Sequence, residues 1–327
     1  MSGWRVGVSA DLAAWGDLGL DRLRAADADV RFLPPDDGVL TAAHVDGCDA
    51  VLFAAPAVTA ETVSGPHPPR HLARFGVGLD TVDVAACTRA GVAVTVTPDG
   101  ARRAVATAAL TLVLAVLQRV REKDARVRAG DWSDRSGLLG RGLTGRTVLV
   151  VGFGSVAAEF CRLTAPFATV NLAHTRRREV PRGPGDPDVE RVALAEGLRR
   201  ADVVVVTAPL TPQTHHLLDA AVLAHLRPGA VLVNVARGPV VDTAALLDAL
   251  RDGRLAGAGL DVFEDEPLPA DHPLTTFPNV VLAPHCLAWT DELALGNGSS
   301  AVTSILALRA GEPVGNLVDP AVLEVAS

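Results

Sequence analysis

Residues 147–160 have the sequence TVLVVGFGSVAAEF, and this stretch decides the fold of the larger part of the chain. An apolar run, residues 147–151, leads directly into the turn Gly152-Phe153-Gly154, and a helical segment follows. This is a GxGxxA turn between a buried strand and a helix, the context that a dinucleotide-binding site requires. Gly152 permits the tight turn, and Gly154 lets a pyrophosphate approach the backbone at the helix N-terminus. A plain glycine turn is the alternative.

Two series of apolar runs alternate with helical segments along the chain. The second and stronger series consists of residues 147–151, 169–173, 202–207, 230–236, 258–263 and 280–283. Several of these runs are continuous and rich in Val and Leu, which is typical of parallel strands buried on both faces. The first series consists of residues 5–8, 30–33, 49–54, 73–76 and 91–94, and one long helix, about residues 101–129, separates the two. The pattern predicts an α/β protein.

The totals limit the classes of protein to be considered. A chain of 327 residues is long enough for two domains, and a net charge of −8 argues against a nucleic-acid partner. The cysteines lack metal-binding or disulfide spacing, so we expect no metal and a reduced compartment. The longest apolar stretch, residues 104–117, is short for a membrane span, and no apolar run precedes Asp11. We therefore expect a cytoplasmic protein without a membrane partner.

The end of the second strand in the stronger series indicates which dinucleotide binds. NAD sites usually carry an acidic residue there, which accepts hydrogen bonds from the ribose hydroxyls. Here Thr175 occupies that place, Arg176, Arg177 and Arg178 follow, and the first carboxylate is Glu179. Arginines can bind a 2′-phosphate, so the stretch favours NADP(H), with NAD(H) as the alternative. A solvated basic turn is the interpretation without a ligand.

Three charged side chains each follow a later strand of the same series. Arg237 lies after residues 230–236, Glu266 after residues 258–263, and His285 after residues 280–283. Because an open parallel sheet binds its ligands at the carboxyl ends of its strands, these residues are expected to converge. Taken singly, each has a structural interpretation: a strand cap, a solvated loop acid or a packed histidine.

Five segments occur along the chain in a fixed order: GVGLDTVD (76–83), the GxGxxA turn, NVARG (234–238), LDVF (260–263) with Glu266-Pro267, and Pro284-His285. In these segments the chain resembles the D-isomer-specific 2-hydroxyacid dehydrogenases, the family that includes glyoxylate and hydroxypyruvate reductases. The resemblance covers roughly residues 49–318. It implies two Rossmann- or flavodoxin-like domains with parallel sheets and a cleft between them. The substrate domain would comprise residues 1–97 and 287–327, and the dinucleotide-binding domain residues 98–286.

The resemblance also assigns roles to individual residues. His285 is the acid/base, Glu266 is its carboxylate partner, and Arg237 holds the substrate, whose other contacts are Val77, Gly78 and Trp289. The expected cofactor contacts are Gly152, Phe153, Gly154, Ser155, Val156, Thr175, Arg176, Arg177, Ala208, Pro209, Thr214, Val235, Ala236, Asp261 and His285. These types suit hydride transfer, since a histidine can protonate the carbonyl oxygen and an arginine can bind a carboxylate bidentately.

The function expected is transfer of a hydride between NAD(P)H and a small 2-keto acid such as glyoxylate or hydroxypyruvate. Alternatives are the same scaffold acting on phosphite, formate or a phosphonate, or a dinucleotide-sensing binding protein. The resemblance implies a homodimer, in which residues 132–142 could be an exchanged arm. Arg102 and Arg103, at a helix start, are either ligand-binding or merely exposed. The adjacent His215 and His216 are interpreted as loop or helix-start residues and not as metal ligands.

Overall fold

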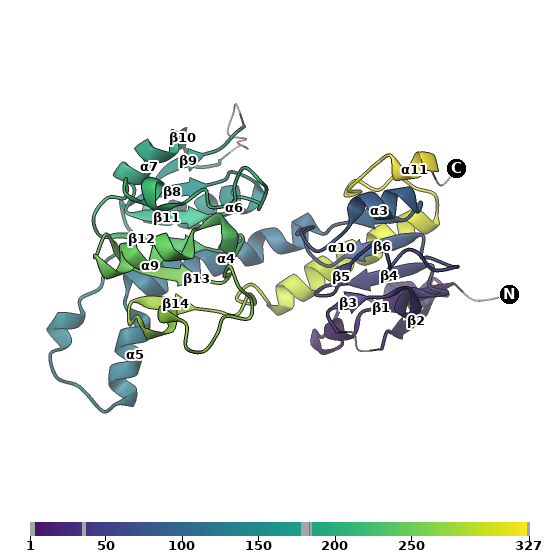
Figure 1. Ribbon diagram of the computed structural model, residues 1–327, viewed down its shortest axis with the longest axis horizontal. Helices are drawn as coiled ribbons and strands as arrows, with labels where there is room; N and C mark the ends of the chain where they lie inside the picture. The colour runs from purple at the N-terminus through teal and green to yellow at the C-terminus, as the bar shows by residue number, and fades with distance from the viewer. Residues whose placement is uncertain (1–3, 35–36, 178–182, 184, 326–327) are drawn as a thin grey trace. The chain divides into compact units, whose positions relative to one another are not determined.

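The computed structural model describes residues 4–34, 37–177, 183 and 185–325. The chain divides into two compact units, which are described separately. The first unit consists of Met1–Ala104 with Trp289–Ser327, and the second is Val105–Ala288 (Figure 1). The boundaries expected from the sequence lie a few residues away, at 97/98 and 286/287.

A seven-stranded parallel sheet forms the centre of the second unit (Figure 1). Its strand order is β10-β9-β8-β11-β12-β13-β14. In chain order the strands are β8 (Thr147–Val151), β9 (Val170–His174), β10 (Val189–Arg191), β11 (Val203–Val206), β12 (Ala230–Asn234), β13 (Leu255–Leu260) and β14 (Val280–Leu282). The chain starts at β8 and moves first to one side and then to the other, so β8 and β11 form a topological switch point. Ligands of open α/β sheets bind at such a point.

Both faces of this sheet are covered by helices, which explains why its strands are apolar throughout. Leu149, Val204 and Leu232 lie in the core on one face, which α7 (Leu194–Arg200), α8 (Ala220–Leu223) and α9 (Thr243–Arg251) cover. Val148 and Val203 lie in the core on the other face, under α4 (Pro98–Leu117) and α6 (Ser155–Thr164). Alternate residues of each strand thus enter opposite cores.

The first unit is built around a five-stranded parallel sheet of order β2-β1-β4-β6-β7. The strands are β1 (Arg5–Val8), β2 (Asp29–Phe32), β4 (Ala50–Phe53), β6 (His71–Arg74) and β7 (Ala93–Thr95). A separate pair joins β3 (Val39–Leu40) to β5 (Ala57–Val58). The helices are α1 (Asp21–Ala25), α2 (Ala42–Val45), α3 (Val84–Arg89), α10 (Asp291–Arg309) and α11 (Val322–Val325).

The long helix expected over about residues 101–129 is two helices in the structure. The first helix, α4, ends at Leu117, and α5 (Val120–Arg128) begins after Arg119, whose φ of +54° is left-handed. The loop around Arg141 ends α4 at Leu117, because the Arg141 N–H donates to the Leu117 carbonyl oxygen at 2.8 Å. Arg119 in turn donates to the Gly137 carbonyl at 2.6 Å. The break therefore depends on contacts with residues far along the chain.

By length and composition alone, α4 is long and apolar enough to cross a membrane. The expectation that this stretch is too short is therefore wrong as to length, because the helix begins at Pro98 and has 20 residues. Half of its most apolar window is buried inside the protein, and core helices of globular domains pass the same test. Leu112 and Val113 pack in the same core as strands β8, β11 and β12.

Candidate functional site

The turn after β8 has the geometry that a dinucleotide requires. Gly152 has a φ of +90°, and a Cβ placed on it would lie 2.6 Å from the backbone of Ala208. Only glycine fits there, because a side chain would be both strained and in collision. Gly154 caps the N-terminus of α6, and a Cβ on it would meet nothing within 4 Å. This open backbone at a helix N-terminus can receive an anion, so the residues present fit a pyrophosphate.

The loop after β11 lies beside this turn. Ala208 is buried against Gly152, and the Thr207 hydroxyl donates to the Gly152 carbonyl at 2.8 Å. Thr214 closes the loop, because its hydroxyl donates to the Pro209 carbonyl at 2.6 Å and accepts from the Thr211 N–H at 2.7 Å. The structure thus brings the predicted contacts Ala208, Pro209 and Thr214 into one closed loop next to the glycine turn.

The residues predicted to bind the ribose 2′-phosphate of the cofactor follow the end of β9. Thr175 directly follows the strand, and Arg176 and Arg177 are exposed. Arg178 and Glu179 lie outside the described residues. The structure adds one cation that the sequence reasoning missed, since the Arg191 Nε donates to the Thr175 carbonyl at 3.2 Å. Arg191 ends β10, a three-residue edge strand whose polar sequence carries no clear strand pattern.

His285 and Glu266, predicted as the acid/base and its partner, are hydrogen-bonded in the structure. The distance from His285 Nδ1 to Glu266 Oε2 is 2.8 Å, and the Phe263 N–H donates to Glu266 Oε1 at 2.9 Å. Partial burial acts to raise the pKa of Glu266. Hydrogen bonds from His285 and Phe263 and the charge of Arg237 outweigh it and hold that pKa below its usual value. Glu266 is thus an ionised acceptor with both oxygens engaged.

Arg237 is held at the end of β12 by Asn234. The Asn234 side chain donates to the Arg237 carbonyl at 2.9 Å and accepts from the Ala236 N–H at 3.0 Å. Val235 and Ala236 therefore form a short, fixed turn that leads to the guanidinium group. The positive charge of Arg237 contributes to holding the pKa of Glu266 below its usual value.

Asp261 supports the segment that carries His285. It is almost completely buried, and its Oδ1 accepts hydrogen bonds from the N–H groups of Cys286 and Leu287, each at 3.1 Å. Burial raises the pKa of Asp261 above its usual value. These bonds fix the backbone immediately after His285, so Asp261, which the sequence predicts as a cofactor contact, also supports the segment that carries His285.

The predicted substrate residues Val77, Gly78 and Trp289 belong to the first unit. Val77 is half exposed, and the Gly78 carbonyl accepts from Arg74 Nε at 3.2 Å. Trp289 is 57% exposed, and its ring lies 4.5 Å from that of Trp15. Trp15 also packs edge-on against Phe75, which precedes the glycine segment. Trp289 therefore belongs to an aromatic cluster beside that segment.

The remaining candidates of the sequence analysis have simple environments. Arg102 pairs with Asp99 at 3.5 Å on the surface, and Arg103 is exposed. His215 and His216 lie in the loop after β11 with their rings stacked 4.1 Å apart, so the two neighbours face each other. The four cysteines are free, and within the described part of the chain no three His, Cys, Asp or Glu side chains form a group that could hold a metal.

Comparison with known proteins indicates the family of the chain. A family model for the D-isomer specific 2-hydroxyacid dehydrogenase NAD binding domain matches residues 110–286, more than half of the chain. A glyoxylate reductase of Aeropyrum pernix is 39% identical over 264 residues, which are 78% of each chain. One of Korarchaeum cryptofilum is 36% identical over 298 residues, 89% of each chain. The crystal structure of the TT0316 protein of Thermus thermophilus superposes with a TM-score of 0.86 at 34% identity, covering 96% of this chain and all of that one.

The chain belongs to the D-isomer-specific 2-hydroxyacid dehydrogenase family. It is an oxidoreductase that acts on CH–OH donors, and its cofactor is a nicotinamide dinucleotide. The fold class and the resemblance inferred from the sequence are confirmed.

Proposed function

We propose that the chain reduces small 2-keto acids such as glyoxylate or hydroxypyruvate, with NADPH preferred over NADH. The observation that carries this function is the hydrogen bond between His285 and Glu266, next to Arg237, at the carboxyl end of the sheet. The similarity to the glyoxylate reductases of Aeropyrum pernix and Korarchaeum cryptofilum supports the choice of acid. The alternatives, phosphite, formate or phosphonate chemistry and a binding protein without catalysis, gain no support from these relatives.

In the mechanism that this geometry supports, each residue has one task. The glycine turn at Gly152 and Gly154 would hold the dinucleotide, which when bound would supply the hydride. Glu266 holds Nδ1 of His285, which leaves Nε2 to donate a proton to the carbonyl oxygen. Arg237 binds the substrate carboxylate. Asp261 keeps the His285 segment in place.

The test is an absorbance assay of purified protein with NADPH or NADH and four acids: glyoxylate, hydroxypyruvate, pyruvate and phenylpyruvate. His285→Ala should lower kcat by roughly 100-fold or more, since general acid catalysis contributes about 10²–10⁴-fold. The circular dichroism spectrum of this variant should match that of the wild type, which shows that it is folded. No turnover of any acid by the wild type, despite tight cofactor binding, would contradict the proposed function.

The preference for NADPH is supported by Thr175 in place of an acidic residue and by the arginines around it. Arg176 and Arg177 are exposed at the end of β9, and Arg191 is tied to the Thr175 carbonyl. Each charge-assisted hydrogen bond to a 2′-phosphate contributes about 1.5–3 kcal/mol. Arg176→Ala and Arg191→Ala should therefore raise KM for NADPH by roughly tenfold or more and leave KM for NADH unchanged. Equal effects on both cofactors would argue against a phosphate site here.

We also propose that the protein is a homodimer and that it is located in the cytoplasm without membrane attachment. Helix α5 has no buried residue, and Val127, Trp132 and Leu139 are large apolar side chains exposed on it and on the following loop. Apolar groups gathered on one segment often mark an interface. A sizing column should show a dimer, and Leu139→Asp should shift it toward the monomer. A wild-type monomer near 34 kDa would contradict the dimer, and cell fractionation tests the location.

A further inference from the structure

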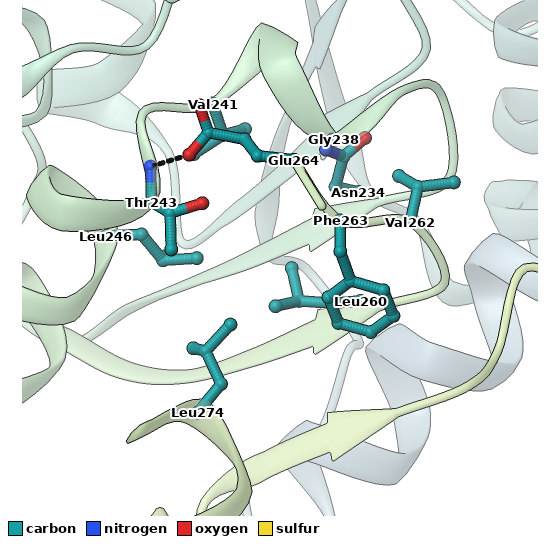
Figure 2. A pocket seen from close by; sticks show the side chains of 10 residues that line it. All are labelled: Asn234, Gly238, Val241, Thr243, Leu246, Leu260, Val262, Phe263, Glu264 and Leu274. Atoms are coloured by element: carbon teal, nitrogen blue, oxygen red, sulfur yellow. Dashed lines mark hydrogen bonds between the residues drawn. The ribbon is translucent and has the colours of Figure 1, made fainter. Parts of the chain in front are cut away.

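His216 and Glu264 form a hydrogen-bonded pair that is separate from the proposed catalytic residues. The distance from His216 Nε2 to Glu264 Oε1 is 2.5 Å, although the two residues are 48 positions apart. The second carboxylate oxygen of Glu264 accepts from the Thr243 N–H at 2.8 Å, at the first turn of α9. Figure 2 shows this bond, with the Glu264 carboxylate directed toward Thr243. Glu264 therefore joins two segments other than its own.

The environment of Glu264 keeps it charged. Partial burial acts to raise its pKa, but hydrogen bonds from Thr243 and His216 outweigh burial and hold the pKa below its usual value. The other groups that face His216 are Asp242, whose Oδ2 lies 3.9 Å from His216 Nδ1, and the stacked ring of His215. An ionised carboxylate can only accept hydrogen bonds, so His216 Nε2 is the donor.

Each segment that the pair joins also carries a predicted site residue. His216 lies two positions after Thr214, which closes the loop beside the glycine turn, and its N–H donates to the Pro239 carbonyl at 2.7 Å. Pro239 follows the Arg237-Gly238 turn, and Glu264 lies two positions before Glu266. The side-chain pair thus connects the cofactor loop with the loop of Glu266, and the backbone of His216 connects the cofactor loop with the arginine turn.

The arginine turn and the glutamate loop are in tight contact. A Cβ placed on Gly238 would lie 1.8 Å from the carbonyl carbon of Phe263 and 2.4 Å from the N atom of Glu264. A small pocket lies beside this contact, lined mainly by apolar side chains such as Leu246, Leu260 and Leu274 (Figure 2). Its cavity volume of about 10 Å³ is about what a single water molecule needs, so the pocket is far too small for a ligand. Glu264 and Thr243 therefore close a packed junction and do not line a second ligand site.

We propose that Glu264 and His216 are positioning residues that hold Glu266 and Arg237 in register with the cofactor loop. The inference rests on the proposed roles of His285, Glu266 and Arg237, and it adds the means by which the three segments keep their spacing. Without Glu264, the loop that contains Glu266 loses its side-chain bonds to His216 and Thr243 and keeps the packing of Phe263 in the core and against Gly238. The bond from Glu266 to His285 Nδ1 then loses its fixed geometry.

The experiment compares Glu264→Ala, Glu264→Gln and His216→Gln with the wild type in steady-state reduction of glyoxylate by NADPH. Glu264→Ala should lower kcat by about 10- to 100-fold, because a displacement of about 1 Å remote from the chemistry can cost 100-fold. Glu264→Gln should recover part of this loss, since its amide oxygen can still accept from Thr243. His216→Gln, which keeps a donor, should be milder than His216→Ala. The double variant His216→Ala/Glu264→Ala should be no worse than Glu264→Ala alone.

A pH profile separates positioning from a general loss of stability. The bond from His285 helps to lower the pKa of Glu266, so its loss moves the acidic limb of kcat/KM to higher pH in Glu264→Ala. In a Glu266→Gln background, Glu264→Ala should cause little further loss. Asp252→Ala is the matched control, since Asp252 also accepts from a backbone N–H and a cation, both of Arg254, in the same unit. It should keep the wild-type kcat and profile.

The outcomes distinguish the inference from the proposed function. An active His285→Ala variant would overturn the proposed function. An inactive His285→Ala variant together with wild-type kcat and pH profile in Glu264→Ala would overturn the positioning role alone. A Glu264→Ala variant that lowers only the melting temperature, as measured by circular dichroism, would also overturn it.

Discussion

The backbone of His285 has a φ of +55°, in the left-handed region that side chains other than glycine rarely adopt. Such a conformation costs on the order of 1–3 kcal/mol and persists only where the surroundings enforce it. Here the Asp261 carboxylate binds the next two N–H groups, and Glu266 binds the ring. The strain therefore lies at the residue that we propose as the acid/base, and side chains of other segments maintain it.

Arg237 offers the sharpest prediction for a single residue. Arg237→Lys keeps the positive charge but loses the planar fork that binds a carboxylate bidentately. We expect kcat/KM for the keto acid to fall by roughly 100-fold, since two charge-assisted bonds are replaced by one. Isothermal titration with NADPH should show an unchanged Kd, because Asn234 holds the backbone of the turn irrespective of the side chain. A variant with wild-type kcat/KM would show that Arg237 does not bind the substrate.

At the scale of elements, the strand–turn–helix unit β8-α6 combines two different requirements for glycine. Gly152 needs its positive φ and the absence of a Cβ, because the backbone of Ala208 lies against it. Gly154 has neither constraint inside the protein, since a Cβ there would meet open space. Its small size is required only by what approaches the helix N-terminus from outside.

The two glycines should therefore respond differently to substitution. Gly152→Ala should lower the melting temperature and weaken NADPH binding together, because strain and collision cost on the order of 1–3 kcal/mol. Gly154→Ala should leave the melting temperature unchanged and still weaken NADPH binding by about tenfold or more, as a lost charge-assisted bond implies. Thermal unfolding and a fluorescence titration measure both quantities. Equal stability losses in the two variants would contradict the distinction.

At the scale of the molecule, each unit has a buried core around its parallel sheet. The core of the first unit contains a titratable side chain. His71 on β6 is fully buried, and its Nε2 is hydrogen-bonded to the Thr95 hydroxyl at 2.8 Å. Burial lowers the pKa of His71 to about 3. The folded protein therefore keeps this ring neutral at pH values where the unfolded chain takes up a proton.

This difference predicts acid sensitivity of the fold. The contribution of His71 is complete above the unfolded pKa of about 6.5 and decreases as the pH falls toward 3, with a slope of about 1.4 kcal/mol per pH unit. His71→Gln does not titrate but can still donate to Thr95. Its free energy of unfolding should fall less steeply between pH 6 and 4 than that of the wild type. Urea titrations at several pH values measure this, and parallel slopes would exclude His71 as the cause.

Much of the fold and of the site could be predicted from local patterns. Continuous apolar runs mark strands buried on both faces, and a glycine pattern between strand and helix marks an anion-binding turn, because both requirements are met within a few residues. The positions of Arg237, Glu266 and His285 after three strands were predictable for the same reason. Parallel strands end at one edge, so residues that follow them converge without any further information.

Other features depend on contacts between distant segments. The sequence does not show that Arg191 reaches the Thr175 carbonyl, because β10 is a short polar edge strand formed only by pairing with β9. The break between α4 and α5 requires the loop at Arg141. Adjacent side chains in a regular helix would point apart, but the rings of His215 and His216 are stacked. The backbone of His216 is left-handed, with a φ of +48°, and its side chain reaches Glu264. The sequence by itself determined the strands, the glycine turn and the order of the reactive residues, because short-range patterns encode them. Only the tertiary structure decided which side chains hold them in place, because such bonds depend on where separate loops meet in space.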